Sequence, residues 1–247
     1  MKITSVNNDL VKETAKLLKG KYRDESGLFL IEGEKGVIEA IEAGINIKHI
    51  FTLELAKDYP EEITIETTEA VLSKISDAKT APKVIAVAQQ PQQGTSLLKK
   101  ANKVVLLEGI KDAGNLGTIL RTAAAFNIDA VILYGETVDL YNPKCVRSTV
   151  GCLWKTPVFK INEFDELKNI FTHFERVATL PKGNDVINLT EYTPIEKTLV
   201  MFGSEADGLS QELKDFATKN ITIEMAPNVE SLNLSVSACI IMYKIRN

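Results

Sequence analysis

The second half of the chain contains apolar runs that have the character of strands covered on both faces. Such nearly continuous runs are typical of a parallel sheet, whereas half-exposed strands alternate apolar and polar residues. They are VVLLEGI at 104–110, DAVILYG at 129–135, TLVMFG at 198–203 and ITIEM at 221–225. Helical patterns alternate with them at 117–126, 164–174, 211–219 and 234–245. This alternation predicts an α/β fold with a parallel sheet.

The first part of the chain predicts a smaller α/β domain. A helix is expected at 10–19, a strand at 28–33, and a helix over EKGVIEAIEAG that ends at Gly44; further strands are expected over HIFTL, ITIETT and VIAVAQQ. The polar stretch QQPQQGTS at 89–96 carries nothing that could fill a core, so it is the expected boundary. We therefore expect domains at 1–90 and 103–247, joined by a linker at 91–102.

Composition places the chain in a broad class. Its 247 residues suffice for one large or two modest domains, and its three cysteines, none in a CxxC pair, favour a reducing compartment over disulfides or structural zinc. The amino terminus lacks the apolar core of a secretory signal, and no apolar stretch is long enough to span a bilayer. We expect a cytoplasmic protein without a metal and without a membrane partner.

The charge balance weighs against a nucleic-acid partner without excluding one. The formal net charge is −4, whereas phosphate binding favours an excess of Lys and Arg. A local basic face can still bind RNA on an acidic protein. The candidate face consists of Lys12, Lys16 and Lys19 at helical spacing, followed by Lys21 and Arg23.

Three loops follow predicted strands, at the edge where parallel sheets bind ligands. They are EGIKDAGNLGTILRTA at 108–123, GSEADGLS at 203–210 and MAPNVESLNLSVSA at 225–238. The first two have GxxxxG spacing but lack the Lys and Ser/Thr of a phosphate loop, and the second is acidic, so neither is typical of a nucleotide-phosphate site. There is no GxSxG motif, and the two histidines are far apart in sequence.

Taken together, the loops resemble the three signature motifs of the SpoU (TrmH-like) family of RNA ribose 2'-O-methyltransferases, in the SPOUT superfamily. The matching pieces are NLGTILRTAAAF, FGSEADGLS and IEMAPNVESLNLSVSA, with YNPKCVRSTVGCLWKTPV at 141–158 similar to the family's linking segment. The amino-terminal part is similar, more loosely, to the RNA substrate-recognition domain often found ahead of this catalytic domain. The chain departs from many relatives at Ala113, where they have Pro, and around 79–82.

The resemblance implies a carboxy-terminal sheet with a deep trefoil knot, S-adenosylmethionine as cofactor, and a homodimer that pairs through the knotted domain. It implies cofactor contacts by Gly203, Ile223, Met225 and Leu232. It also implies a catalytic role for Arg121, which the family mechanism often assigns as the base. Because a free guanidinium holds its proton, we expect instead that Arg121 grips the adjacent phosphate and orients the 2'-hydroxyl. Asn115, Glu205, Ser231 and Asn233 would hold Arg121 and the ribose in register.

The added amino-terminal domain favours ribosomal RNA over tRNA as the substrate. Two other activities stay open at this point: methylation of a base, and a role as a non-catalytic RNA-binding or ribosome-assembly factor.

Overall fold

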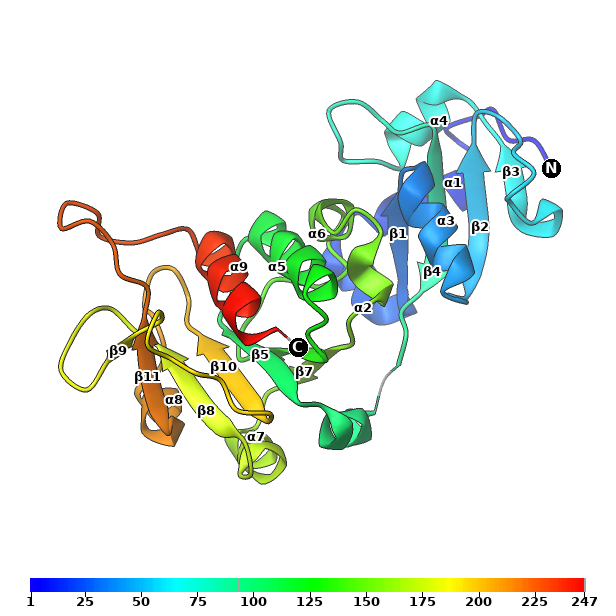
Figure 1. Cartoon of the computed structure of the whole chain (residues 1–247). Helices are drawn as coiled ribbons and strands as arrows, with labels where there is room; N and C mark the ends of the chain where they lie inside the picture. The colour runs from blue at the N-terminus through cyan, green and yellow to red at the C-terminus, as the bar shows by residue number, and fades with distance from the viewer. Residues whose placement is uncertain (93, 247) are drawn as a thin grey trace. The chain divides into compact units, whose positions relative to one another are not determined.

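The computed structural model describes residues 1–92 and 94–246, which form two compact units (Figure 1). The amino-terminal unit comprises Met1–Gln92 and Asp139–Trp154, and the carboxy-terminal unit comprises Gln93–Val138 and Lys155–Asn247. The predicted domains placed 139–154 with the second domain, whereas in the structure this segment packs with the first. A division of the chain at one linker therefore does not account for segment 139–154, which returns to the amino-terminal unit.

The amino-terminal unit is built on a four-stranded mixed sheet in the order β1-β4-β2-β3. Strand β4 runs antiparallel to β1 and β2, while β2 and β3 are parallel. Apolar side chains from the sheet and helices, including Leu30, Phe51, Ile85 and Val11, form its core. The elements are α1 (Asp9–Lys16), α2 (Gly20–Ser26), β1 (Leu28–Glu32), α3 (Glu34–Glu42), β2 (Ile47–Thr52), η1 (Glu61–Ile63), β3 (Thr64–Glu66), α4 (Glu69–Lys74) and β4 (Val84–Gln89).

The segment 139–154 carries α6 (Pro143–Ser148) and η3 (Cys152–Trp154), and buried charges and aromatic rings hold it in the amino-terminal unit. The Arg23 guanidinium is 2% exposed and contacts Asp139 through Nε at 2.7 Å and Nη2 at 2.5 Å. The Phe29 ring lies 4.6 Å from that of Tyr141 and 5.9 Å from that of Trp154. Arg23 and Phe29 are buried, whereas Asp139 is 31% exposed, so a part-buried ion pair and these ring contacts join the segment to the unit.

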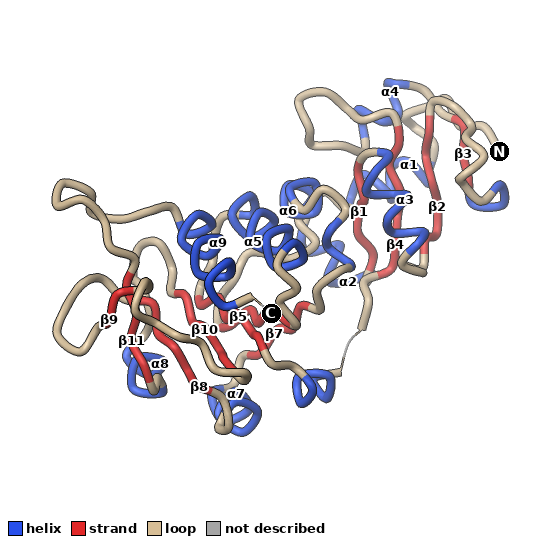
Figure 2. Tube along the Cα trace, in the orientation of Figure 1, coloured by secondary structure: helices blue, strands red, loops and turns tan. Residues whose placement is uncertain are grey.

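The carboxy-terminal unit contains a seven-stranded sheet in the order β7-β6-β5-β10-β8-β11-β9, and every pairing in it is parallel. This confirms the predicted α/β class with a parallel sheet. Figure 2 draws the strands of this sheet in red. The elements are η2 (Thr95–Lys100), β5 (Lys103–Glu108), α5 (Ala113–Ala125), β6 (Ala130–Tyr134), β7 (Val158–Ile161), α7 (Phe164–Phe171), β8 (Glu175–Thr179), β9 (Ile187–Asn188), β10 (Thr198–Phe202), α8 (Gln211–Phe216), β11 (Lys219–Thr222) and α9 (Leu234–Ile245).

Helix α5 begins four residues before its predicted start, and the reason is a side-chain cap. Asp112 accepts a hydrogen bond from the backbone N–H of Asn115, which satisfies one of the unpaired donors of the first turn. Asn115 consequently lies in the first turn of α5, at the carboxyl edge of the sheet. Helix α9 packs against α5, as Figure 1 shows. Among the described residues, no helix is both long enough and apolar enough to cross a membrane.

Candidate active site

A cavity of about 380 Å³ opens where strands β10 and β11 end. Segments 179–181, 202–205, 221–225 and 230–234 contribute to its wall. The predicted cofactor-contacting residues all line this one cavity: Gly203, Ile223, Met225 and Leu232. The parallel sheet explains this convergence, because loops that are far apart in sequence leave the same edge of the sheet.

Three of the predicted catalytic side chains form a hydrogen-bonded chain beside this cavity. The Asn115 amide donates to Glu205 Oε1 at 2.5 Å, and the Asn233 amide donates to Asn115 Oδ1 at 3.2 Å. Asn233 Oδ1 in turn accepts from the backbone N–H of Ser235 at 2.9 Å, so the same side chain caps α9. Ser231 lines the cavity next to them. The structure thus joins the three predicted loops through their polar side chains.

Arg121 is not part of this hydrogen-bonded series of side chains. It lies on α5 and is exposed, and its side chain makes no hydrogen bond or ion pair with any residue in 1–92 or 94–246. It follows Asn115 by six positions in the helix, a spacing that turns the two side chains about 120° away from each other. Within one chain, the structure does not bring Arg121 into the Asn115–Glu205–Asn233 cluster.

Gly203 lines the cavity, but its own loop explains the need for glycine. A Cβ atom at this position would lie 1.9 Å from the carbonyl carbon of Gly208 and 2.1 Å from the backbone nitrogen of Leu209. The loop is a tight turn in which the backbones of Ser204 and Gly208 exchange hydrogen bonds of 3.2 and 3.0 Å. Glycine here lets the loop close on itself, a requirement separate from the cofactor contact that the resemblance implies for Gly203.

Two residues that sequence reasoning passed over also hold the site in place. Asp112 caps α5 and fixes the turn that carries Asn115. Glu108, at the end of β5, accepts a hydrogen bond of 2.7 Å from the backbone N–H of Ser210 and so anchors the loop that carries Glu205. The cap had a signal in the sequence, since Asp is a favoured N-cap residue directly before a helix.

The predicted basic face is only partly realised. Lys12 and Lys16 lie on α1, but Lys19 follows the end of that helix, and Lys21 lies on α2. Three of these exposed lysines have acidic partners three or four residues away: Asp9 at 3.3 Å from Lys12, Glu13 at 2.7 Å from Lys16, and Glu25 at 3.8 Å from Lys21.

The prediction that Arg23 binds RNA is wrong, because its guanidinium is buried. Besides the contacts to Asp139, its Nη1 donates to the carbonyl of Leu17 at 2.7 Å. A buried guanidinium with these partners cannot reach a phosphate, so Arg23 serves the packing of the unit instead.

Comparison with known proteins agrees with this architecture. Residues 102–243 match the SpoU rRNA Methylase family, and residues 8–86 match the MRM3-like substrate binding domain. The chain is 30% identical over 252 residues to the 23S rRNA (guanosine(2553)-2'-O)-methyltransferase RlmP of Bacillus subtilis, covering 99% of this chain and 98% of that protein. It is also 30% identical over 256 residues to an uncharacterized tRNA/rRNA methyltransferase of Synechocystis, covering 99% and 93%.

Solved structures resemble this one over nearly its full length. The crystal structure of an AdoMet-bound rRNA methyltransferase from Sinorhizobium meliloti superposes with a TM-score of 0.89 at 28% identity, covering 99% of this chain and 96% of that one. Because the family match spans more than half of the chain and its motifs meet at one cavity, the chain belongs to the SpoU rRNA methylase family.

Proposed function

We propose that this protein transfers a methyl group from S-adenosylmethionine to a ribose 2'-hydroxyl of ribosomal RNA. The observation that carries the proposal is the Asn115–Glu205–Asn233 cluster beside the apolar cavity, in a chain of the SpoU family. Relatives of similar length are named as 23S rRNA 2'-O-methyltransferases, which supports ribosomal RNA as the substrate class. A cytoplasmic location follows from this substrate and is part of the proposal.

The cavity has the size and lining that S-adenosylmethionine needs. Its volume of about 380 Å³ lies within the range of small-molecule sites, and Ile223, Met225 and Leu232 offer apolar surface for a flat base. Gly203 belongs to the tight loop that forms one wall. When bound, S-adenosylmethionine supplies an electrophilic methyl group on a sulfonium that is already a good leaving group. The tasks left to the protein are placement of the ribose and removal of its proton.

The polar cluster is suited to placing the ribose. Asn115, Glu205 and Asn233 are cross-linked by hydrogen bonds, so their remaining donor and acceptor positions are held in fixed directions. Ser231 adds a hydroxyl on the cavity wall. In our proposal these groups orient the ribose hydroxyls toward the methyl donor.

Arg121 grips the phosphate next to the target ribose and orients the 2'-hydroxyl. A free guanidinium holds its proton with a pKa above about 12, so the proton of the hydroxyl passes to phosphate or water instead. The test compares Arg121→Lys and Arg121→Ala, with turnover and cofactor affinity measured separately. Both variants should lose turnover and keep cofactor affinity, because Lys cannot reproduce the bidentate contact. Near-normal turnover in either would refute this role.

We further propose that two copies pair through α5 and α9. Helix α9 exposes an apolar stripe of Val236, Ile240 and Tyr243, at 46%, 38% and 55% exposure. Residues spaced by four and three share one helix face, and Tyr243 contacts Phe126 at the end of α5. Apolar stripes of this kind are typical of protein interfaces. Pairing there would bring the exposed Arg121 of α5 close to a second chain, which can complete the site.

The carboxy-terminal segment has a path that supports the trefoil knot implied by the family resemblance. Strand β11 lies beyond β8 in the sheet, yet the segment that follows it returns past β10 to α5. Asn233 then contacts Asn115, and α9 packs on α5. We propose that this segment is threaded through a loop of the same unit and that the knot holds the cofactor cavity open.

The amino-terminal unit binds the RNA substrate in this proposal, as its match to a substrate binding domain suggests. The exposed Lys12, Lys16, Lys19 and Lys21 remain the proposed backbone contacts. Their acidic partners are themselves exposed, and such pairs are weak enough to open for a phosphate. Charge reversal of Lys12 and Lys16 should weaken RNA binding and flatten its dependence on salt.

The decisive test of the function is a map of ribose methylation across total RNA from cells with and without the protein. One ribosomal position should lose its 2'-O-methyl group in the deletion and regain it with the wild-type gene. Complementation by an Asn115→Ala variant should fail. A lost mark on tRNA, or on a base, would replace the proposed substrate. An unchanged map together with no binding of S-adenosylmethionine in calorimetry would indicate a non-catalytic RNA-binding factor.

A further inference from the structure

Two side chains at neighbouring strand ends hold the start of helix α8. Tyr134, the last residue of β6, donates its hydroxyl proton to Oε2 of Glu212, in the first turn of α8, at 2.9 Å. Glu108, the last residue of β5, accepts from the backbone N–H of Ser210, the N-cap of α8, at 2.7 Å. Tyr134 and Glu108 are paired neighbours in the parallel ladder of β5 and β6. Two adjacent strand ends therefore hold one short stretch, residues 210–212.

This stretch ends the loop at 203–210, which carries Glu205. At the other end of the loop, Gly203 packs so closely against the backbone of Gly208 that a Cβ atom would not fit. Ser204, Glu205 and Gly208 line both the proposed cofactor cavity and a neighbouring cavity of about 490 Å³. The loop is thus the wall between two cavities, and the position of Glu205 depends on how both ends of the loop are held.

Tyr134 is suited to a lasting contact with this loop. Its side chain is 7% exposed, and it belongs to the same apolar core as Leu209 and Leu213, which flank the stretch. Burial, together with the hydrogen bond to Glu212, raises the pKa of the Tyr134 phenol to about 12. The hydroxyl therefore keeps its proton in mildly alkaline buffers and remains a donor. Because Glu212 is exposed, water can replace this donor, so its loss affects global stability only modestly.

We propose that Tyr134 is a positioning residue for methyl transfer, acting with Glu108 to hold the loop at 203–210 so that Glu205 meets Asn115. The inference rests on the proposed function, in which Glu205 and Asn115 orient the target ribose. The hydrogen bond between these two residues joins the loop to the start of α5, so a displaced loop loses it. A misplacement of about 1 Å at a reacting group can lower a rate about a hundredfold, so a small movement of the loop is enough.

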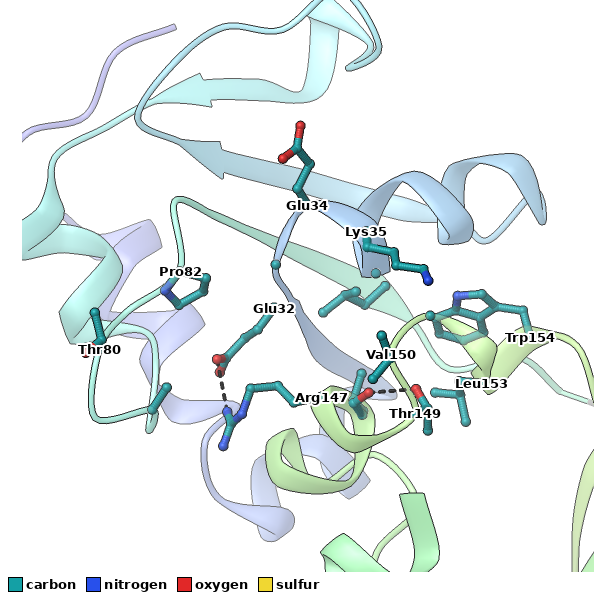
Figure 3. A pocket seen from close by; sticks show the side chains of 16 residues that line it. Glu32, Glu34, Lys35, Thr80, Pro82, Arg147, Thr149, Val150, Leu153 and Trp154 are labelled. Atoms are coloured by element: carbon teal, nitrogen blue, oxygen red, sulfur yellow. Dashed lines mark hydrogen bonds and ion pairs between the residues drawn. The ribbon is translucent and has the colours of Figure 1, made fainter. Parts of the chain in front are cut away.

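A strand-end contact of this kind has no catalytic meaning by itself. Glu32, the last residue of β1, contacts Arg147 at 2.9 Å beside a cavity of the amino-terminal unit that the proposed reaction does not use (Figure 3). In the carboxy-terminal unit, the buried Tyr192 donates its hydroxyl proton to Glu175 Oε2 at 2.7 Å. Glu175 begins β8, so this contact lies at the amino ends of the parallel strands, opposite the candidate active site. Tyr192 is therefore a matched control for Tyr134.

Tyr134→Phe and Tyr192→Phe each remove one hydroxyl group and keep the ring. The substrate is ribosomal RNA from cells that lack the protein, at saturating S-adenosylmethionine. Tyr134→Phe should lower kcat roughly tenfold, since a hydrogen bond to a charged group contributes about a factor of ten. Its affinity for S-adenosylmethionine in calorimetry should stay close to that of wild type. Tyr192→Phe should keep its kcat although its unfolding midpoint falls at least as far, because Glu175 is more deeply buried than Glu212.

Glu108 allows a test by conservative replacement. Glu108→Gln keeps an oxygen that can accept from the N–H of Ser210, so it should retain most of the turnover. Glu108→Leu removes the acceptor and should lose about as much turnover as Tyr134→Phe. Since both contacts hold the same stretch, the double variant Tyr134→Phe/Glu108→Leu should lose more than the product of the two single losses.

Hydrogen exchange of backbone amides tests the contact without depending on activity. Tyr134→Phe should speed the exchange of peptides that cover 203–213, and Tyr192→Phe should not. Unchanged exchange in Tyr134→Phe would overturn the inference, as would an unchanged kcat in both Tyr134→Phe and Glu108→Leu or an equal loss of kcat in Tyr192→Phe. A wild-type protein that methylates no RNA would refute the proposed function instead, and the exchange rates would still decide whether Tyr134 holds the loop.

Discussion

At the scale of single residues, the sequence motifs identify the candidate side chains of the site, and the structure shows the hydrogen bonds between them. The loops around Asn115, Glu205 and Asn233 carry residues typical of the family in the typical order, so the resemblance predicts a catalytic role for each, and those roles stay predictions. Their mutual hydrogen bonds could not be predicted, because the contacts join residues 90 and 118 positions apart. The same holds for Arg23, whose burial depends on Asp139, 116 residues away.

Asn115→Ala tests the cluster at its centre. It removes the bridge between Glu205 and Asn233 and leaves the cap of α5 at Asp112 in place. We expect turnover to fall about a hundredfold, because a misplaced ribose loses most of the benefit of positioning. Cofactor affinity by calorimetry and the unfolding midpoint should change little. Thr118→Ala, one turn further on the exposed side of α5, is the control; equal losses in both variants would contradict a specific role for Asn115.

Gly203→Ala tests the loop that walls the cofactor cavity. The added Cβ would overlap the backbone of Gly208, which cannot move aside as a flexible side chain could. We expect a loss of stability of about 1–3 kcal/mol and a loss of S-adenosylmethionine binding, measured by urea unfolding and calorimetry. The control is Gly183→Ala, where the Cβ meets nothing closer than 3.9 Å. Normal cofactor binding by Gly203→Ala would contradict the conclusion that the cofactor cavity depends on the tight turn at Gly203.

At the scale of elements, the hydrophobic pattern and the capping residues explain which strands and helices could be predicted from the sequence. The continuous apolar runs identified β5, β6, β10 and β11. Helix α9 begins and ends at its predicted residues, and Asn233 caps its start. Strand β8 (Glu175–Thr179) was missed because the charged Glu175 and Arg176 at its start break the apolar run. Helix α6 was missed because it is short and its packing depends on distant partners in β1.

The packing of segment 139–154 into the amino-terminal unit predicts a dependence of stability on alkaline pH. Burial, with a smaller effect from Asp139, raises the pKa of Tyr141 from 10.0 to about 12. The unfolded chain therefore loses the phenolic proton first, so the stabilising difference is complete below pH 10 and is lost as the pH rises toward 12. The loss amounts to about 2–3 kcal/mol.

Urea unfolding at pH 9 and pH 11.5 measures this difference. Wild type should lose more stability between the two pH values than Tyr141→Phe, which has no phenolic proton to release. Tyr243→Phe, at an exposed site on α9, is the control and should follow wild type. Parallel behaviour of wild type and Tyr141→Phe would mean that Tyr141 is solvated and that the segment is not packed as described.

At the scale of the whole molecule, one chain leaves the exposed apolar stripe of Val236, Ile240 and Tyr243 along α9 unexplained. Contiguous exposed apolar surface of this kind typically marks an interface. Ile240→Glu places a charge at its centre. If two copies pair there, the variant must bury an unpaired carboxylate, and its dimer dissociation constant should rise a hundredfold or more. Sedimentation at micromolar concentration should then find a dimer for wild type and a monomer for the variant.

Turnover measurements distinguish a dimer that completes the active site from a dimer that plays no part in catalysis. If Arg121 acts across the interface, Ile240→Glu should lose turnover together with dimerisation, and both should return when the protein concentration exceeds the raised dissociation constant. Ile195→Glu, at another exposed isoleucine (51%), should remain a fully active dimer. A monomeric wild type would remove the interface altogether. A monomeric but fully active Ile240→Glu would show that Arg121 serves the site of its own chain, and the turn of about 120° that separates it from Asn115 would then have to be bridged by the RNA.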